Sequence, residues 1–452
     1  MKTWNQLLVR HGWLLEEKEP DRFDCSRETA ENLAFLQESL TKAKVLFNLR
    51  GSELIFHQDS LDEEDWIRVL DFPFRGKNGD YWCRPGLDEP EIQKLDTYMA
   101  GVVRQFHRLG FYTPLSCDGH DQRKPFIQFD QRINIDWLIG LLRVFGLPRA
   151  PFRRQNGNKF NFPIVRRQLL DLAEQMSFIQ PDWLEKGAGF VEEQLLYKEL
   201  EDLLSIPGAS SKEEAIRETV KDKLLPYVDF ITEDSAGNLL AEMICRRGNG
   251  PTVLLNAHLD TVTDLDPGRR IVKKGKIWTS SEGILGADDR AGVALLIAMA
   301  RHLNSSDFQG RVKFIVTVEE ERGLIGAGQV ADHFLWGVDG AIVLDRRGKA
   351  DIVTSCHGVQ RFCSEAYGKF FEKVAREIGL TGWKCTAGGF SDTLVWADHG
   401  IESVNLSVGY GYEHTDREYL DVHAAYQTLT LLKAVFQRSI EFRNLLRKLS
   451  AC

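Results

Sequence analysis

The stretch that decides the fold is VLLNAHLDTV, residues 253–262. Its apolar start, Val253–Leu255, predicts a buried strand that presents His258 and Asp260 at its carboxyl end. Side chains alternate along a strand, so these two residues point to the same side. A histidine with a carboxylate behind it is the arrangement of an oriented metal ligand, in which the acid fixes the ring. Alone, the pair could also be a satisfied polar contact at a sheet edge.

Further acids and a second histidine lie at or near the ends of predicted strands and helices in the second half of the chain. They are Asp288 and Asp289 in GADDRAG (286–292), just before an apolar helix, Glu319–Glu321 after the strand at 314–318, Asp345 after the strand at 341–344, and His414 beyond the strand at 403–406. Ligands of α/β sheets gather at the carboxyl ends of strands. A glutamate run alone could be a solvated turn, and an Asp–Asp pair a helix N-cap. Their joint occurrence favours a functional site.

The donor types indicate a two-metal site. Carboxylates and imidazoles without a thiolate suit Zn²⁺ or a similar divalent ion. Two cations roughly 3.5–4 Å apart need a shared carboxylate, and the pair Asp288–Asp289 is the obvious source. Glu320 and Glu321 point to opposite sides if the backbone is extended, so one can bind metal while the other faces the substrate water as a base.

Six motifs together resemble the di-zinc exopeptidase superfamily, which groups the M20, M28 and M42 metallopeptidases with related amidohydrolases. They are HLDTV (258–262), GADDRAG (286–292), VEEERGLIGA (318–327), LDRRG (344–348), GGFSDT (388–393) and EHT (413–415). The resemblance covers residues 191–452. It implies the zinc-exopeptidase fold, an α/β architecture with a mixed, mostly parallel sheet sandwiched by helices.

The resemblance also implies a role for each motif residue. The metal ligands would be His258, Asp288, Glu321, Asp345 and His414. Asp288 would bridge two Zn²⁺ ions, with Co²⁺ or Mn²⁺ as alternatives, and a cis peptide would join it to Asp289. Glu320 would be the general base, and Asp260 would orient the first histidine.

The predicted function is hydrolysis of peptide or amide bonds by a metal-activated water, with aminopeptidase action as the first choice. An N-acyl amino acid amidohydrolase of the same fold is the alternative within the hydrolases. A nucleic-acid- or protein-binding regulator that uses the fold as a scaffold is the alternative outside them. The ligand set is complete, which disfavours the scaffold, since a decayed site should have lost some of these acids.

The chain departs from some members of the superfamily. The segment between Asp345 and His414 is too short for the dimerisation domain of many M20 enzymes, and His258 and Asp288 are too close for the insertion of the M42 type. Arg322 could contact a substrate carboxylate or be solvated. Asp392, with the adjacent serine of GGFSDT, could line the substrate pocket or cap a turn.

Composition limits the remaining function classes. The chain has 452 residues, 43% of them hydrophobic and 27% charged, with a formal net charge of -9, which argues against a mainly nucleic-acid-binding protein. Its eight cysteines include no CxxC motif, as in reduced cytosolic proteins. No signal peptide is apparent at the start, and no window approaches the run of about 18 apolar residues that spans a bilayer. We therefore expect a cytoplasmic protein without a membrane partner.

The predicted organisation is an N-terminal α+β accessory domain of unknown role over residues 1–180 and a catalytic domain over residues 191–452, joined near 177–190. The stretch 137–170 contains no acid. Its cations are Arg143, Arg149, Arg153, Arg154, Lys159, Arg166 and Arg167. They could bind an anionic partner such as a nucleic acid, although a solvated basic face is the preferred interpretation. The segment from Asp118 to Gln168 also resembles half of a LAGLIDADG homing-endonuclease fold, without the helix that carries that signature.

A second group of potential ligands occurs in the N-terminal half. Cys117, Asp118 and His120 are close in sequence, and His57 and His107 could complete another metal site. Their spacing matches no established motif, so a turn is the preferred interpretation of CDGH (117–120).

Overall fold

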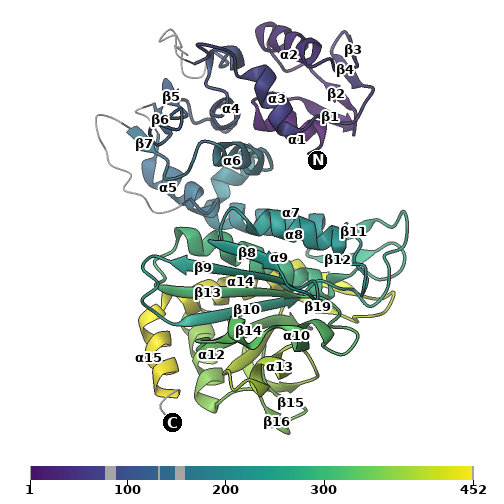
Figure 1. Cartoon of the computed structure of the whole chain (residues 1–452), viewed down its shortest axis with the longest axis vertical. Coiled ribbons are helices and arrows are strands. Elements are labelled where there is room, and N and C mark those ends of the chain that lie inside the picture. The colour runs from purple at the N-terminus through teal and green to yellow at the C-terminus, as the bar shows by residue number, and fades with distance from the viewer. Residues whose placement is uncertain (1, 77–87, 131–132, 148–157, 450–452) are drawn as a thin grey trace. The chain divides into compact units, whose positions relative to one another are not determined.

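The stretch that opened the sequence analysis forms the strand β10 (Thr252–His258), in the middle of a nine-stranded sheet. The computed structural model describes residues 2–76, 88–130, 133–147 and 158–449 (Figure 1). The chain divides into two compact units, Met1–Val191 and Glu192–Cys452.

The second unit is built on that large sheet, with the strand order β16-β15-β18-β14-β10-β13-β9-β8 and with β17 paired to β15. Its strands are β8 (Phe230–Glu233), β9 (Leu239–Cys245), β10, β13 (Gly310–Thr317), β14 (Gly340–Arg346), β15 (Asp351–Cys356), β16 (Gln360–Arg361), β17 (Lys384–Gly388) and β18 (Ser403–Ser407). The central strands β18, β14, β10 and β13 are parallel neighbours, and β9 and β8 continue the sheet antiparallel. The predicted mixed α/β architecture is confirmed.

Helices cover both faces of this sheet, because the central strands are apolar on both faces. On β10, Val253 and Leu255 belong to a large core with the helices α7, α8, α9, α12 and α14, whereas Leu254 belongs to a second core with α10, α11 and α13. On β13, Phe314 belongs to the large core and Ile315 to the second core. The alternation of side chains along the strands therefore builds two cores, one on each face.

The helices of the second unit are the following (Figure 1). They are α7 (Ala188–Leu204), α8 (Glu214–Leu224), α9 (Ala287–Ser305), α10 (Ile325–Gln329), α11 (Asp332–Leu335), α12 (Glu365–Glu377), α13 (Thr393–Asp398), α14 (Val422–Gln437) and α15 (Ser439–Leu449). Helix α9 packs on β10 and β14, and α14 packs on α9. A separate small sheet has the order β11-β12-β20-β19, with β11 (Ile271–Lys274), β12 (Ile277–Ser280), β19 (Tyr410–Gly411) and β20 (Tyr419–Asp421).

The first unit contains two antiparallel sheets and six α-helices among its described residues. One sheet has the order β1-β2-β4-β3, with β1 (Glu16–Glu19), β2 (Arg22–Asp24), β3 (Phe47–Arg50) and β4 (Glu53–Phe56); the other has the order β5-β6-β7, with β5 (Leu115–Cys117), β6 (Phe126–Phe129) and β7 (Asn158–Asn161). The helices are α1 (Trp4–Arg10), α2 (Ala30–Lys42), α3 (Glu63–Leu70), α4 (Ala100–Arg108), α5 (Ile135–Val144) and α6 (Gln168–Ser177), with short 3-10 turns η1 (Ile92–Lys94) and η2 (Pro181–Lys186). Helices α1, α4 and α6 pack together.

Parts of the basic stretch 137–170 can be located in this unit. Arg149, Arg153 and Arg154 lie outside the described residues. Arg166 pairs with Asp121, and Arg167 pairs with Glu64. Within the described part of the chain, no helix is both long and apolar enough to cross a membrane.

Candidate metal centre and active site

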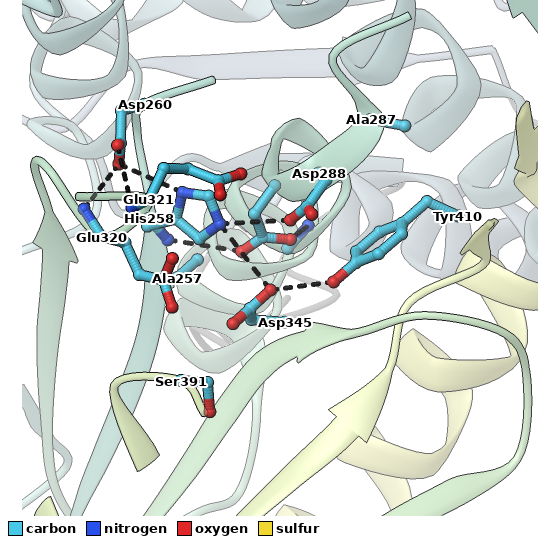
Figure 2. Close-up of polar contacts among 12 residues, drawn as sticks. Ala257, His258, Asp260, Ala287, Asp288, Glu320, Glu321, Asp345, Ser391 and Tyr410 are labelled. Carbon is cyan, nitrogen blue, oxygen red and sulfur yellow. Dashed lines mark hydrogen bonds and ion pairs between the residues drawn. The ribbon is translucent and has the colours of Figure 1, made fainter. Parts of the chain in front are cut away.

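His258, the last residue of β10, occupies the centre of a buried polar cluster (Figure 2). Its Nδ1 lies 3.2 Å from Oδ1 of Asp260, and its Nε2 lies 3.2 Å from Oδ1 of Asp288 and 3.7 Å from Oδ1 of Asp345. One ring nitrogen therefore meets the orienting carboxylate while the other faces two acids. This is the geometry of a metal-binding histidine whose tautomer is fixed from behind.

Asp260 connects the histidine to the glutamate loop that follows β13. Its carboxylate is fully buried and accepts a hydrogen bond from Ser210 Oγ at 2.7 Å. It also accepts bonds from the backbone N–H groups of Glu320 and Glu321, at 3.0 and 3.2 Å. A single side chain thus fixes the imidazole ring and the backbone of both adjacent glutamates.

Two groups of potential ligands share Asp288. His258, Asp288 and Asp345 form the first, and Asp288, Glu321 and His414 form the second; within each group the donor atoms lie within 4.8 Å of one another. Oδ1 of Asp288 faces His258, whereas Oδ2 lies 3.1 Å from His414 Nε2. His414 Nε2 also lies 2.7 Å from Oε1 of Glu321. The two oxygens of Asp288 therefore face different groups, as a bridging carboxylate requires.

The electrostatics of these groups fit divalent cations. Burial is the main reason that the pKa of Asp345 is raised to about 7; the hydrogen bond to His258 opposes this increase, and the nearby charge of Asp288 adds to it. Hydrogen bonds to Asp288 and Glu321 raise the pKa of His414 to about 10. The two groups together offer three carboxylates and two imidazoles. Imidazole and carboxylate donors in this number suit Zn²⁺, Co²⁺ or Mn²⁺.

Glu320 differs from its neighbour because it belongs to neither ligand group. Burial raises the pKa of the Glu320 carboxyl to about 10; Asp345, Asp392 and Glu321 add to the increase, and His258 opposes it. Cations bound between the two groups would lower this pKa again, since an opposite charge favours the ionised form. With cations bound, the Glu320 side chain would be an ionised carboxylate near the ligands that could accept a proton.

Several supporting residues were not identified from the sequence. Tyr410 donates a hydrogen bond to Oδ1 of Asp345 at 2.9 Å, and the Asn405 side chain accepts from the Asp345 backbone N–H at 3.0 Å. Glu418 is buried and accepts hydrogen bonds from four consecutive backbone N–H groups, those of residues 285–288. It therefore fixes the chain at the start of α9. These residues have ordinary types and spacings, so no sequence signal distinguished them.

The backbone at the start of α9 also shapes the site. The peptide bond between Asp288 and Asp289 is cis, as the resemblance implies. Asp289 is buried and accepts hydrogen bonds from the N–H groups of Gly292, at 2.9 Å, and of His258, at 3.3 Å. A Cβ at Gly292 would lie 1.8 Å from the carbonyl oxygen of Leu344, so only glycine permits this approach of α9 to β14.

Two further sequence predictions can be compared with the structure. Asp392 and Ser391 do not line an open pocket, because both are buried. Asp392 accepts hydrogen bonds from Thr317 Oγ1 at 2.5 Å and from Asn256 Nδ2 at 3.3 Å, beneath the ends of β13 and β10. Arg322 is exposed and donates to Glu319, which favours the solvated interpretation.

Part of the second unit matches a peptidase family. The sequence model of peptidase family M28 matches residues 238–436. The uncharacterized protein YqjE of Bacillus subtilis is 29% identical over 189 residues, which are 40% of this chain and 50% of that protein. Peptidase T of Halothermothrix orenii is 31% identical over 137 residues, 27% of this chain and 32% of that enzyme. The chain thus spans half or less of the length of these relatives.

Solved structures show the same fold. Aminopeptidase PepT from Bacillus cereus superposes with a TM-score of 0.50 at 20% identity, over 55% of this chain and 99% of that chain. A tripeptidase from Staphylococcus aureus superposes with a TM-score of 0.50 at 18% identity, over 55% of this chain and 99% of that chain. The resemblance to the di-zinc exopeptidase superfamily is confirmed, and within it residues 238–436 match peptidase family M28.

Proposed function

We propose that the second unit is a metal-dependent exopeptidase, and an aminopeptidase in the first instance. The observation that carries this proposal is the shared carboxylate of Asp288, whose two oxygens face two different ligand groups. The match to a peptidase family supports hydrolysis of peptide or amide bonds as the reaction. We assign the first unit as an accessory domain.

The ligand groups define where metal ions would bind. His258, Asp288 and Asp345 would hold one ion, and Asp288, Glu321 and His414 the other. Zn²⁺ is the first choice, with Co²⁺ or Mn²⁺ as alternatives, because the donors are imidazole nitrogens and carboxylate oxygens. Such ions supply Lewis acidity, which polarises a carbonyl group and makes a water molecule more acidic.

The chain's own residues would manage the proton and the geometry. Glu320 would accept a proton from the attacking water and deliver it to the departing amine, as a general base that becomes a general acid. Asp260 would position this glutamate through its backbone N–H and, through Nδ1, orient His258. Tyr410 would hold the carboxylate of Asp345 in place by donating its hydroxyl proton.

Elemental analysis of the chain, purified without a chelating tag, tests this proposal. Asp288→Ala removes a ligand from both groups, so we expect it to bind two fewer divalent ions per chain than the unaltered protein. Asp266→Ala is a matched control, because Asp266 belongs to neither group. Equal metal content in Asp288→Ala and the unaltered chain would overturn the two-metal site.

The substrate class needs a separate measurement. Aminoacyl amides and short peptides with a free amino group should be hydrolysed by the metal-loaded chain, and activity should disappear in Asp288→Ala. Hydrolysis of N-acyl amino acids in preference to these substrates would instead support the amidohydrolase alternative. Bound metal without either activity would contradict the peptidase assignment while leaving the metal site intact.

A further inference from the structure

The first unit contains a third group of potential metal ligands. Asp96, Cys117, Asp118 and His120 each offer a donor atom, and these four atoms lie within 4.8 Å of one another. Cys117 ends β5, the next three residues begin the connection to β6, and Asp96 lies just before α4. The fold thus brings a residue from 21 positions earlier to a sequence cluster that alone indicated only a turn. His57 and His107 are not part of the group.

Asp96 carries a buried oxygen that has no hydrogen-bond partner among the described residues. Its side chain is only 3% exposed. Oδ2 accepts the backbone N–H of Asp118 at 2.9 Å, but none of the described residues donates a hydrogen bond to Oδ1. The closest approach of a cation recorded for Oδ1 is His120 Nε2, at 3.6 Å. A buried carboxylate oxygen without a donor is costly, which points to a missing partner such as a bound cation.

The surroundings of Cys117 suit a thiolate ligand. The backbone N–H of Gly119 and the guanidinium of Arg123 both donate to its Sγ, each at 3.4 Å. Donors of this kind outside the ligand shell also orient the ligands of known metal sites. The thiol is also buried, so it is shielded from solvent at the centre of the group.

Two neighbouring arginines, Arg75 and Arg166, direct their hydrogen bonds to groups other than Asp96. Buried Arg75 directs its guanidinium to the backbone carbonyls of Leu70, Ile92 and Leu95. Arg166 lies 3.9 Å from Asp118 but pairs at 2.5 Å with Asp121. Neither arginine therefore neutralises Asp96 directly.

We propose that Asp96, Cys117, Asp118 and His120 bind one divalent metal ion, Zn²⁺ in the first instance, as a structural site of the first unit. One thiolate, one imidazole and two carboxylates complete a four-coordinate shell of the borderline donors that Zn²⁺ accepts. A shell filled by protein ligands leaves no position for substrate, so the role would be structural. The ion would fasten the β5–β6 connection to the segment that precedes α4.

The site is compact on two sides. A Cβ at Gly119 would lie 2.0 Å from the carbonyl oxygen of Arg123, and a Cβ at Gly76 would lie 1.8 Å from Oδ1 of Asp96. Both positions also have positive φ, which glycine adopts without strain. The backbone therefore closes over the four ligands where a side chain would not fit.

Cobalt spectroscopy separates this site from the centre in the second unit. Among the described residues, the two groups around Asp288 contain no cysteine, so a thiolate-to-Co²⁺ charge-transfer band can report only a sulfur site. The full-length Asp288→Ala chain, stripped of metal and titrated with Co²⁺, should bind one ion and show this band. The added change Cys117→Ser should abolish the band, whereas Cys25→Ser, a matched buried cysteine of the same unit, should leave it unchanged.

Asp96→Asn provides a variant that should still fold. The asparagine oxygen can accept the Asp118 N–H as Oδ2 does, but the side chain loses its charge. We expect Co²⁺ to bind roughly 100-fold more weakly, since even changes next to a metal ligand cost 10–100-fold. His120→Gln, at a side chain that is 33% exposed, should weaken binding similarly with little effect on folding.

Three results would overturn the site: no thiolate band in Asp288→Ala, a band that survives Cys117→Ser, or unchanged affinity in both Asp96→Asn and His120→Gln. None of these results would affect the proposed peptidase centre, which is tested by the two ions lost in Asp288→Ala.

Discussion

At the scale of single residues, the distinction between Glu320 and its neighbours is the most consequential. Glu321 belongs to a ligand group. The Glu319 side chain accepts hydrogen bonds from Ser211 and Arg322. Glu320 belongs to no ligand group and accepts neither of these bonds. Three adjacent glutamates therefore have three different surroundings. This division follows from the loop after β13, where Glu319 has positive φ and Asp260 fixes the next two N–H groups.

Glu320→Gln should retain bound metal but lose turnover. Glutamine cannot accept the proton from water, and a general base contributes roughly 100- to 10,000-fold, so kcat should fall by that factor. Steady-state kinetics on a free-amine peptide, together with elemental analysis, measures both effects. Glu319→Gln is the control and should keep most of its activity. Near-normal turnover in Glu320→Gln would show that another group is the base.

Glu63 in the first unit provides a pH prediction away from the metal groups. Burial alone would raise its pKa, but the nearby His11 and the hydrogen-bonded guanidinium of Arg10 outweigh this and lower the pKa to about 2. A carboxyl whose pKa is lowered by folding stabilises the folded state above its unfolded pKa of 4.5. That contribution is lost as the pH falls from 4.5 towards 2, because the folded state must then take up a proton.

Urea unfolding between pH 2.5 and pH 6 measures this contribution. Glu63→Gln should be less stable at pH 6 by roughly 3 kcal/mol, since it leaves the buried Arg10 with one partner fewer. Its stability should also change less with pH than that of the unaltered chain. Asp65→Asn, in an exposed ion pair with Arg68, should follow the unaltered chain. Parallel pH curves for Glu63→Gln and the unaltered chain would contradict the assignment.

At the scale of elements, the sequence identified those with strong apolar patterns and missed those without. Alternation predicts a strand over residues 126–129, and helical spacing predicts helices over 135–145 and 365–378; β6, α5 and α12 lie there. The strand β1 (Glu16–Glu19) was missed because all four of its residues are charged and exposed, so no pattern with a period of two exists. The hairpin β11–β12 was missed for a similar reason, since most of its residues are half-buried or exposed.

The candidate site was largely predictable for the same physical reason. Most of its ligands follow continuous apolar runs that predict buried strands, and parallel strands bring their carboxyl ends together. Glu418 and Tyr410 could not be predicted, because their partners are more than 60 positions away in sequence. Asp96 joins Cys117 only through the tertiary fold, which no local spacing indicates.

Glu418→Gln tests how the start of α9 is fixed. Glutamine has one acceptor oxygen in place of two, so about half of the four backbone N–H groups would lose their partner. Each buried N–H left unpaired costs about 1–3 kcal/mol, so unfolding should become easier by at least 2 kcal/mol. The Asp288 ligand should also shift, so metal affinity should fall.

Urea unfolding and a metal titration of the same variant separate these two effects. Glu282→Gln is a matched control, because Glu282 is exposed and contacts no residue of the ligand groups. Unchanged stability and metal affinity in Glu418→Gln would show that the cap does not position Asp288.

At the scale of the whole molecule, the two units have distinct roles in our proposals. The peptidase-type centre lies within Glu192–Cys452, and the four-residue site with cysteine lies within Met1–Val191. The basic stretch 137–170 belongs to the first unit, but Arg166 and Arg167 already have acidic partners there. A nucleic-acid partner remains a prediction, which salt-dependent retention on heparin would test.

A fragment of residues 187–452 tests whether the centre needs the first unit. The large core of the second unit is formed from residues 196–446, and all five ligands lie within that range, so the fragment should fold and bind the same two ions. Circular dichroism measures the folding of the fragment, elemental analysis measures its metal content, and peptide hydrolysis measures its activity.

Equal kcat/KM for fragment and full chain would assign catalysis to the second unit alone. A folded, metal-loaded fragment with lower kcat/KM on long peptides than on dipeptide substrates would give the first unit a role in substrate selection. A fragment that folds but binds no metal would contradict the self-contained centre, because every ligand proposed for it would still be present.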